Sequence, residues 1–228
     1  MAKLFTTMVQ GLDEILGGGI RWGSSVTIAS DLSDRVALCH QIVANALRRG
    51  FMIYYMCFKE APERLRLLMK EESNLNAEHY EKKGLLRFYT PFETELARRL
   101  KNSEELIKVM DKFTTKMMRD VTLRVIRGKK IVFVLNNVSA AFDLLHEDPK
   151  WKDFTTKGSS WLRKLVKVIS LQIADLKDLG AADSLADFCI VLKNIDGIPY
   201  IKATKVSNFG WVPYRSTQNG IEVAEEFL

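Results

Sequence analysis

Apolar positions in this chain fall into short runs separated by longer amphipathic segments. The short runs are rich in β-branched and aromatic residues and predict buried strands, at residues 26–29, 52–58, 85–89 and 131–135. The longer segments carry Leu, Ile, Val or Met at helical spacing and predict helices, at residues 36–49, from Pro62 onward and within 92–127. This alternation predicts an α/β domain whose mainly parallel sheet is covered by helices on both faces.

The second half of the chain changes character. Residues 146–160 are polar and irregular and predict a long loop, whereas residues 161–176 fit either a short helix followed by a strand or one continuous helix. Late strands are predicted at 188–192, 199–203 and 220–223. The turn signals Asp196-Gly197 and Asn219-Gly220 separate them. We therefore expect one domain over residues 1–228 with an antiparallel extension over residues 193–228.

Composition narrows the class of protein. The chain has 228 residues, of which 47% are hydrophobic, and it contains no apolar run of membrane-spanning length and no secretory leader pattern. Its cysteines are three, far apart and each in an apolar segment, which favours reduced, buried thiols and a cytoplasmic location without a membrane partner. The net charge of +6 comes from scattered basic pairs, which permits a nucleic-acid or acidic-protein partner without requiring one.

The amino-terminal third resembles the RecA/RadA/KaiC group of ATPases, with archaeal KaiC-like proteins as the most similar form. The resemblance rests on the glycine-containing segment Gly11–Ile20, the turn 21–24 before the first core strand, and the segments 44–50 and 58–65. It covers residues 9–72 most closely, includes the fourth strand, and continues from Leu185 to the terminal hairpin. It implies a RecA-like three-layer fold and, in active relatives, ATP hydrolysis with Mg²⁺.

The phosphate-binding loop departs from that family pattern. An active member carries glycines followed by Gly-Lys-Thr or Gly-Lys-Ser, whose N–H groups, lysine and hydroxyl bind the phosphates and Mg²⁺. The matching positions here contain no glycine, and they are Ser30, Asp31, Leu32, Ser33, Asp34, Arg35 and Val36. Arg35 replaces the lysine and Val36 the magnesium-binding hydroxyl. Asp31 and Asp34 are expected to face a triphosphate, each at a cost on the order of 4 kcal/mol, unless a shifted loop turns both carboxylates outward.

Two further positions of the family site are altered. The glutamate pair that activates water in active relatives matches Lys59-Glu60, so that one carboxylate becomes a cation; an ordinary loop ion pair explains these two residues equally well. The magnesium-ordering aspartate after the fourth strand matches Asn136, which has no charge. His40 lies in an amphipathic helix and is interpreted as a core or surface histidine rather than a metal ligand.

These departures favour a non-catalytic RecA-like domain that binds a protein partner or copies of itself and needs no ATP, Mg²⁺ or other metal. Aromatic residues in connecting segments are the candidate interface, namely Trp151, Phe154, Phe209, Trp211 and Tyr214. The last three form an apolar patch if the hairpin tip is exposed, and capping of the end of the sheet explains them equally well. An alternative is a noncanonical ATPase that uses Arg35 and Glu60. A third is a DNA-binding accessory protein of recombination or repair that uses Trp151 with Lys152 and Lys157.

Overall fold

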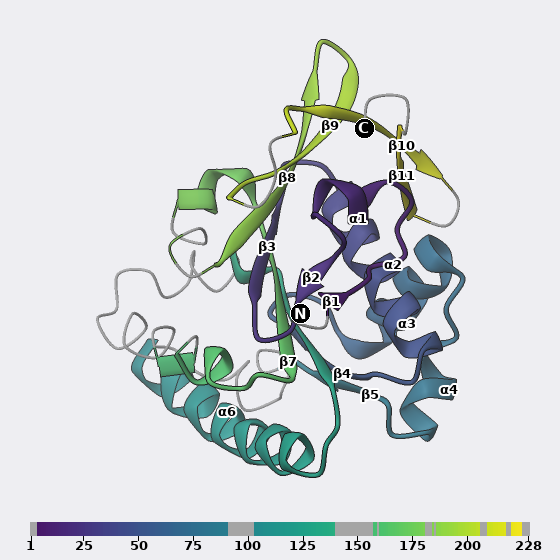
Figure 1. Ribbon diagram of the computed structural model, residues 1–228. Helices are drawn as coiled ribbons and strands as arrows, with labels where there is room; N and C mark the ends of the chain where they lie inside the picture. Colours follow the sequence, from purple (N-terminus) through teal and green to yellow (C-terminus); the bar gives the residue numbers. More distant parts are fainter. Residues whose placement is uncertain are drawn as a thin grey trace.

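The computed structural model describes residues 4–90, 103–139, 157–158, 160–180, 184, 186–205, 209–217 and 220–224. Within these residues nine strands form one twisted sheet (Figure 1). Across the sheet the order is β11 (Gly220–Val223), β10 (Val212–Thr217), β9 (Ile198–Ala203), β8 (Phe188–Ile195), β3 (Ser25–Ala29), β7 (Val168–Ala174), β6 (Ile131–Asn136), β4 (Met52–Cys57) and β5 (Leu86–Tyr89). A separate two-stranded ribbon pairs β1 (Leu4–Phe5) with β2 (Ile20–Arg21).

The sheet is parallel from β8 to β5 and antiparallel from β8 to β11. The α/β class and the antiparallel carboxyl-terminal extension are therefore confirmed. The ambiguous stretch after residue 164 is the strand β7, and the continuous-helix interpretation is wrong. Residues 157–158 and 160 of the predicted loop are helical, and the rest of 146–160 lies outside the described residues. Strand β10 was not predicted, because its pattern was taken for an exposed hairpin tip.

Helices cover both faces of the sheet, as Figure 1 shows. One face carries α1 (Leu12–Ile15), α2 (Asp34–Arg48), α3 (Pro62–Ser73) and α4 (Ala77–Lys82), and the other carries α6 (Ser103–Ile126). Strand β4 serves both hydrophobic cores because its side chains alternate between faces. Tyr55 belongs to the core under α2 and α3, and Tyr54 belongs to the core under α6.

Local sequence signals fix several element boundaries. Helix α3 begins with Pro62 in its first turn, where a missing N–H costs nothing, and ends at Asn74 in the left-handed conformation. The β8–β9 turn places Asp196 and Gly197 at φ values of 52° and 86°. Two positive φ values are the requirement of a type I′ turn, whose twist matches that of the paired strands. The Asp196-Gly197 turn signal is confirmed.

Candidate functional site

The candidate site lies at the carboxyl ends of two neighbouring parallel strands. Strand β3 is central, flanked by β8 and β7, and residues 30–33 connect its carboxyl end to helix α2. Ala29 and Ala174 are in register at the ends of β3 and β7, so Ser30 and Asp175 leave the sheet at the same level. Open α/β sheets bind ligands outside these carboxyl ends, so the predicted loop occupies the position that the resemblance implies.

The loop backbone does not alternate between right- and left-handed residues. A phosphate-binding nest needs such an alternation to turn successive N–H groups toward one point. Among the described residues, positive φ values occur at none of positions 29–36. The N–H of Leu32 instead donates to Ser30 Oγ over 2.9 Å, and that of Val36 donates to the Ser33 carbonyl over 2.9 Å. These two N–H groups thus bond within the loop and do not point together at an anion.

Arg35 lies across the mouth of the loop. Its Nη1 donates to the carbonyl oxygens of Ser30 and Leu32 over 2.6 and 2.9 Å. Its Nη2 forms an ion pair with Asp175. The arginine side chain is only 19% exposed, so the guanidinium is held on two sides within the protein. The loop therefore directs carbonyl oxygens at a cation of this chain, which is the opposite polarity to an anion-binding loop.

Asp31 and Asp34 both point away from the loop and bind neighbouring segments. The repulsion between these carboxylates and a triphosphate is therefore not found, and the shifted loop with outward-turned carboxylates is. Asp34 Oδ2 accepts from Tyr214 Oη over 2.8 Å and from Ser216 Oγ over 3.1 Å, both on β10. Burial raises the pKa of the Tyr214 hydroxyl, and its hydrogen bond to Asp34 raises it further. Asp31 Oδ1 accepts from the Leu176 N–H over 3.2 Å. Each carboxylate therefore fastens the loop to a neighbouring segment.

The other altered positions are occupied by protein contacts too. Val36 packs against the hydrophobic core. Asn136 is buried and its Nδ2 lies 3.7 Å from Cys57 Sγ, which also accepts from the Glu60 N–H over 3.2 Å. Lys59 is exposed, and no ion pair joins it to Glu60 in the described part of the chain. The loop ion pair considered as an explanation of these two residues is therefore absent.

Two residues of the site were missed from sequence. Asp175 pairs with Arg35, and its own N–H donates to the Oγ of buried Ser139 over 2.8 Å. The available signal was the acidic residue that directly follows the apolar run of β7. It could not be used, because the pairing of β7 with β3 joins segments more than a hundred residues apart.

The candidate interface residues separate into different environments. Trp151 and Phe154 lie outside the described residues. Tyr214, on β10, is buried at 4% exposure, so an exposed patch does not include it and the capping alternative fits this residue. Phe209 packs partly buried against the core, and Trp211 is 38% exposed with Lys202 Nζ 6.0 Å from its ring centroid. Trp211 alone among the described members retains a large accessible surface.

His40 forms a buried polar cluster away from the loop. Its ring is inaccessible, with Nδ1 2.5 Å from Glu72 Oε2 and Nε2 2.8 Å from Tyr55 Oη. Both ring nitrogens are therefore satisfied by protein groups, as expected of a core histidine. In the part of the chain that the structure describes, no three His, Cys, Asp or Glu side chains are grouped as metal ligands.

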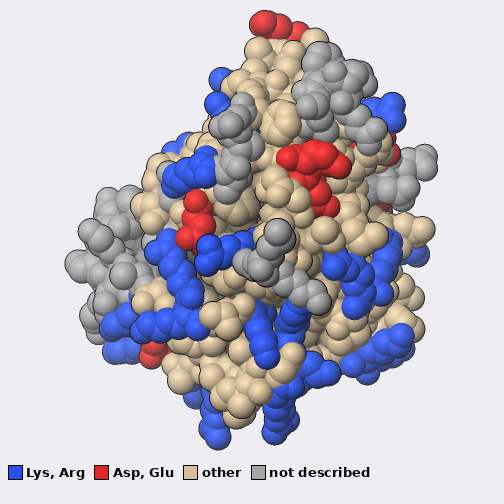
Figure 2. Space-filling view, viewed as in Figure 1, with Lys and Arg blue, Asp and Glu red and all other residues tan. Residues whose placement is uncertain are grey.

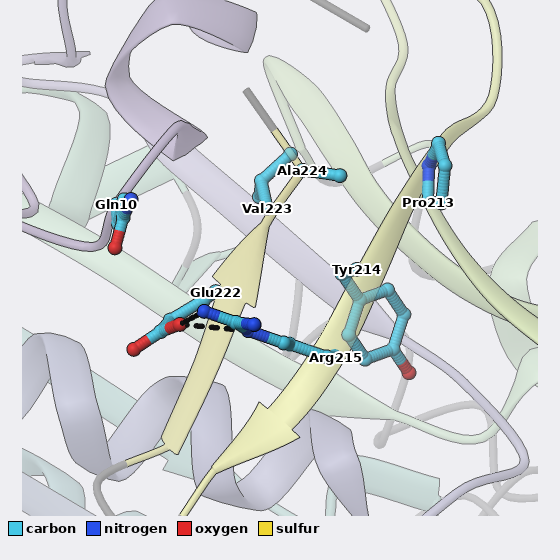
Figure 3. A pocket seen from close by; sticks show the side chains of 7 residues that line it. All are labelled: Gln10, Pro213, Tyr214, Arg215, Glu222, Val223 and Ala224. Carbon is cyan, nitrogen blue, oxygen red and sulfur yellow. Dashed lines mark hydrogen bonds and ion pairs between the residues drawn. The ribbon is translucent and has the colours of Figure 1, made fainter. Parts of the chain in front are cut away.

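A hollow of about 250 Å³ lies beside the carboxyl-terminal hairpin (Figure 3). It is lined by Gln10, Pro213, Tyr214, Arg215, Glu222, Val223 and Ala224. The Arg215 side chain lies across the two strands toward Glu222, with Nη2 to Oε2 at 2.7 Å. Because these two charges neutralise each other, the hollow presents no unpaired charge to a ligand.

Comparisons with known proteins find similarity in three-dimensional structure and none in sequence families. No protein-family model and no curated protein sequence matches the chain. Among solved structures, a KaiC-like protein from the hyperthermophilic archaeon Pyrococcus horikoshii OT3 superposes with a TM-score of 0.78. The match covers 98% of this chain and 100% of that chain at 20% identity.

The chain has a KaiC-like RecA fold. At this identity the likeness establishes the architecture and not the activity. Among the described helices, none combines the length and hydropathy of a membrane-spanning segment.

Proposed function

We propose that this KaiC-like domain is a pseudo-ATPase that acts as a protein-binding or assembly subunit and not as a catalyst. The observation that carries the proposal is the position of Arg35 between the Ser30 and Leu32 carbonyls and Asp175. The loop is already closed around a positive group of the protein itself. Nucleotide binding would first require this arrangement to open.

A nucleotide that bound here would have to replace the contacts of Arg35 with the loop and with Asp175. Hydrogen bonds to charged groups stabilise by about 1.5–3 kcal/mol each, and Arg35 makes three such contacts. Residues 30–36 include no glycine, the residue that most easily adopts the positive φ values of a phosphate nest. Nucleotide affinity is therefore expected to be negligible at millimolar ATP.

Chemistry is disfavoured independently of binding. Phosphoryl transfer depends on positioned cations and N–H donors that neutralise developing charge. Val36 is packed into the core and has no oxygen for Mg²⁺, and the Asn136 amide lies beside Cys57 Sγ. Each missing contact removes transition-state stabilisation, and about 1.4 kcal/mol already corresponds to a tenfold change in rate.

A binding role is supported by the outer side of the antiparallel extension. Trp211 is the aromatic residue left accessible there, and it lies beside Lys202. Aromatic side chains are enriched at the centre of protein interfaces. The domain would thus use its sheet as a rigid support and its extension as a contact surface.

The test is a comparison of Mg²⁺-dependent ATP hydrolysis by the wild type and by Glu60→Gln, together with calorimetric titration of the wild type with a nonhydrolysable ATP analogue. We expect no turnover above background and no heat of binding. Turnover in the wild type that disappears in Glu60→Gln would establish catalysis and contradict the proposal. Binding of the ATP analogue without turnover would indicate a nucleotide sensor, and it would contradict the proposal that Arg35 closes the loop to nucleotides.

A further inference from the structure

The amino ends of the central parallel strands form a surface on the opposite edge of the sheet from the candidate site. The connections before β3, β7 and β6 lie side by side there. Gly23 N donates to the Val168 carbonyl over 2.9 Å, and Ile131 N donates to the Lys167 carbonyl over 3.0 Å. Met52 N continues the row by donating to the Lys130 carbonyl over 3.2 Å. The backbone of this row is therefore fixed by hydrogen bonds between neighbouring segments.

This row carries a concentration of cations, here called the basic edge. Its members are Arg21, Arg127, Lys129, Lys130, Arg163, Lys164 and Lys167. Figure 2 shows Lys and Arg spread over the lower half of the visible face, whereas Asp and Glu gather mainly in the upper half. The side chains of Arg21, Lys129 and Lys164 are exposed and form no ion pair within the described residues.

Carboxylates carried by the adjoining elements are already engaged. Asp120 on α6 pairs with Arg87 over 2.7 Å and with Arg124 over 3.1 Å. Glu81 at the end of α4 pairs with Arg66 over 2.7 Å. Asp187, before β8, accepts from the Ser25 N–H over 2.7 Å. Asp187 keeps its negative charge, because a backbone N–H does not neutralise it, whereas Asp120 and Glu81 are paired with arginines. The basic edge therefore keeps an excess of positive charge, and it attracts a polyanion.

We propose that the basic edge binds the phosphate backbone of a double-stranded nucleic acid. The four neighbouring strands β3, β7, β6 and β4 span about 14 Å at the usual strand spacing of about 4.8 Å. A duplex carries about one charge per 1.7 Å with both strands counted, so about eight phosphate charges fall within this length of duplex, part of them on the side facing the protein. These cations stand on short connections whose backbone is already fixed by hydrogen bonds. The backbone therefore loses little conformational freedom when it binds a rigid, evenly charged duplex.

The side chains between the cations favour a duplex over other polyanions. Single-stranded nucleic acid is held by exposed aromatic rings on which bases stack. Trp22 at this edge is partly buried, with Lys130 Nζ 4.8 Å from its ring centroid. The exposed apolar side chains here are Ile126 at 74% and Val166 at 71%. Without an exposed aromatic ring among the described residues of this edge, both stacking and anchoring in a membrane interface are disfavoured.

This inference is independent of the proposed function, because it concerns the opposite edge of the sheet and needs no nucleotide. It also differs from DNA binding through Trp151, Lys152 and Lys157, which would use the segment after β6. Contacts to the backbone position a protein without reading sequence, so the affinity is expected to be insensitive to base sequence.

The experiment measures fluorescence anisotropy of a labelled 20-base-pair duplex of arbitrary sequence with the full chain, between 50 and 200 mM KCl. We expect binding that weakens steeply with salt. The triple variant Lys129→Gln, Lys164→Gln, Lys167→Gln should reduce the slope of log K against log salt by about 2.7, at about 0.9 per charge removed. The matched control Lys70→Gln, Lys177→Gln, Lys193→Gln removes the same charge elsewhere and should leave the slope unchanged.

Three outcomes would overturn the proposal. One is the absence of duplex binding at 50 mM KCl. Another is an equal loss in both triple variants, which would indicate net charge alone. The third is tighter binding to polyglutamate or to anionic lipid vesicles than to the duplex, which would assign the edge to an acidic protein or a membrane. Circular dichroism checks folding, and if the triple variant unfolds, Lys129→Gln alone should lower the slope by about 0.9.

Discussion

At the residue scale, Arg35 is the side chain that holds the loop after β3 in place. A lysine ammonium is a compact point charge, whereas a guanidinium is a planar fork with five donors. The fork lets Arg35 reach the Ser30 and Leu32 carbonyls with one nitrogen and Asp175 with the other. The same side chain therefore stabilises the loop conformation and joins it to the end of β7.

Shortening this side chain gives the first prediction. Arg35→Ala should lower the free energy of unfolding by about 2–3 kcal/mol, because two carbonyls and a carboxylate lose a charged donor. Arg35→Lys should recover only part of this loss, since one ammonium cannot reach all three acceptors. Urea unfolding followed by circular dichroism gives both values. Equal stability of Arg35→Lys and wild type would show that the fork geometry is not required.

The hydrogen bond from Tyr214 to Asp34 gives a second prediction. Tyr214→Phe should cost about 1–2 kcal/mol of stability, because Asp34 loses a partly buried donor while the ring still fills its place. Ser216→Ala is the matched control, since it removes the other, more exposed donor to the same oxygen. We expect the control to cost less, as measured by thermal unfolding. A larger loss of stability in Ser216→Ala than in Tyr214→Phe would show that Ser216 is the more important donor to Asp34.

At the element scale, one carboxylate fastens helix α6 to the sheet. Asp120 accepts from Tyr54 on β4, from Arg87 on β5 and from Arg124 one turn along the helix. Desolvation alone would raise the pKa of Asp120, but the Tyr54 hydrogen bond and the two guanidinium groups hold the pKa below its ordinary value. Helix α6 is thus held by a charge as well as by its apolar face.

This depressed pKa gives a prediction on acid stability. The ionised Asp120 stabilises the fold above its ordinary pKa of about 3.9, and this contribution is lost as the pH falls through the lower native pKa. Asp120→Asn should therefore be less stable than wild type at pH 7, and the difference should shrink below about pH 4. Thermal unfolding between pH 3 and pH 7 measures it. A difference independent of pH would indicate lost packing instead of lost charge.

At the scale of the whole molecule, the two edges of the parallel sheet differ in character. The carboxyl edge is closed by ion pairs and hydrogen bonds around Arg35, whereas the amino edge carries the basic edge, in which Arg21, Lys129 and Lys164 form no ion pair within the described residues. The antiparallel extension adds a third surface, on which Trp211 is accessible. For this molecule we propose binding rather than catalysis.

The assembly role gives the last prediction. If Trp211 contributes to self-association, Trp211→Ala should shift the mass measured by light scattering toward the monomer at micromolar concentration. Ile198→Ala is a suitable control, because Ile198 is a similarly exposed apolar residue on β9. A monomeric wild type would contradict self-association.

The sequence determined the class of fold and the position of the loop, because local periodicity and turn chemistry act over a few residues. The strands at 26–29, 52–58 and 131–135 and the Asp196-Gly197 turn follow from such short-range preferences. The loss of glycine, lysine and hydroxyl from the loop is likewise visible in the sequence alone. These features require no knowledge of which segments meet.

Only the tertiary structure decided what the altered residues contact. The order of strands places β7 beside β3, and this brings Asp175 to Arg35 across a long sequence separation. The same folding buries the Tyr214 side chain of β10 and turns Asp34 toward it, although the segment also fitted an exposed aromatic tip. The basic edge arises in the same way, from connections that are distant in sequence and adjacent in the sheet. Sheet order depends on long-range burial, and no local pattern encodes it.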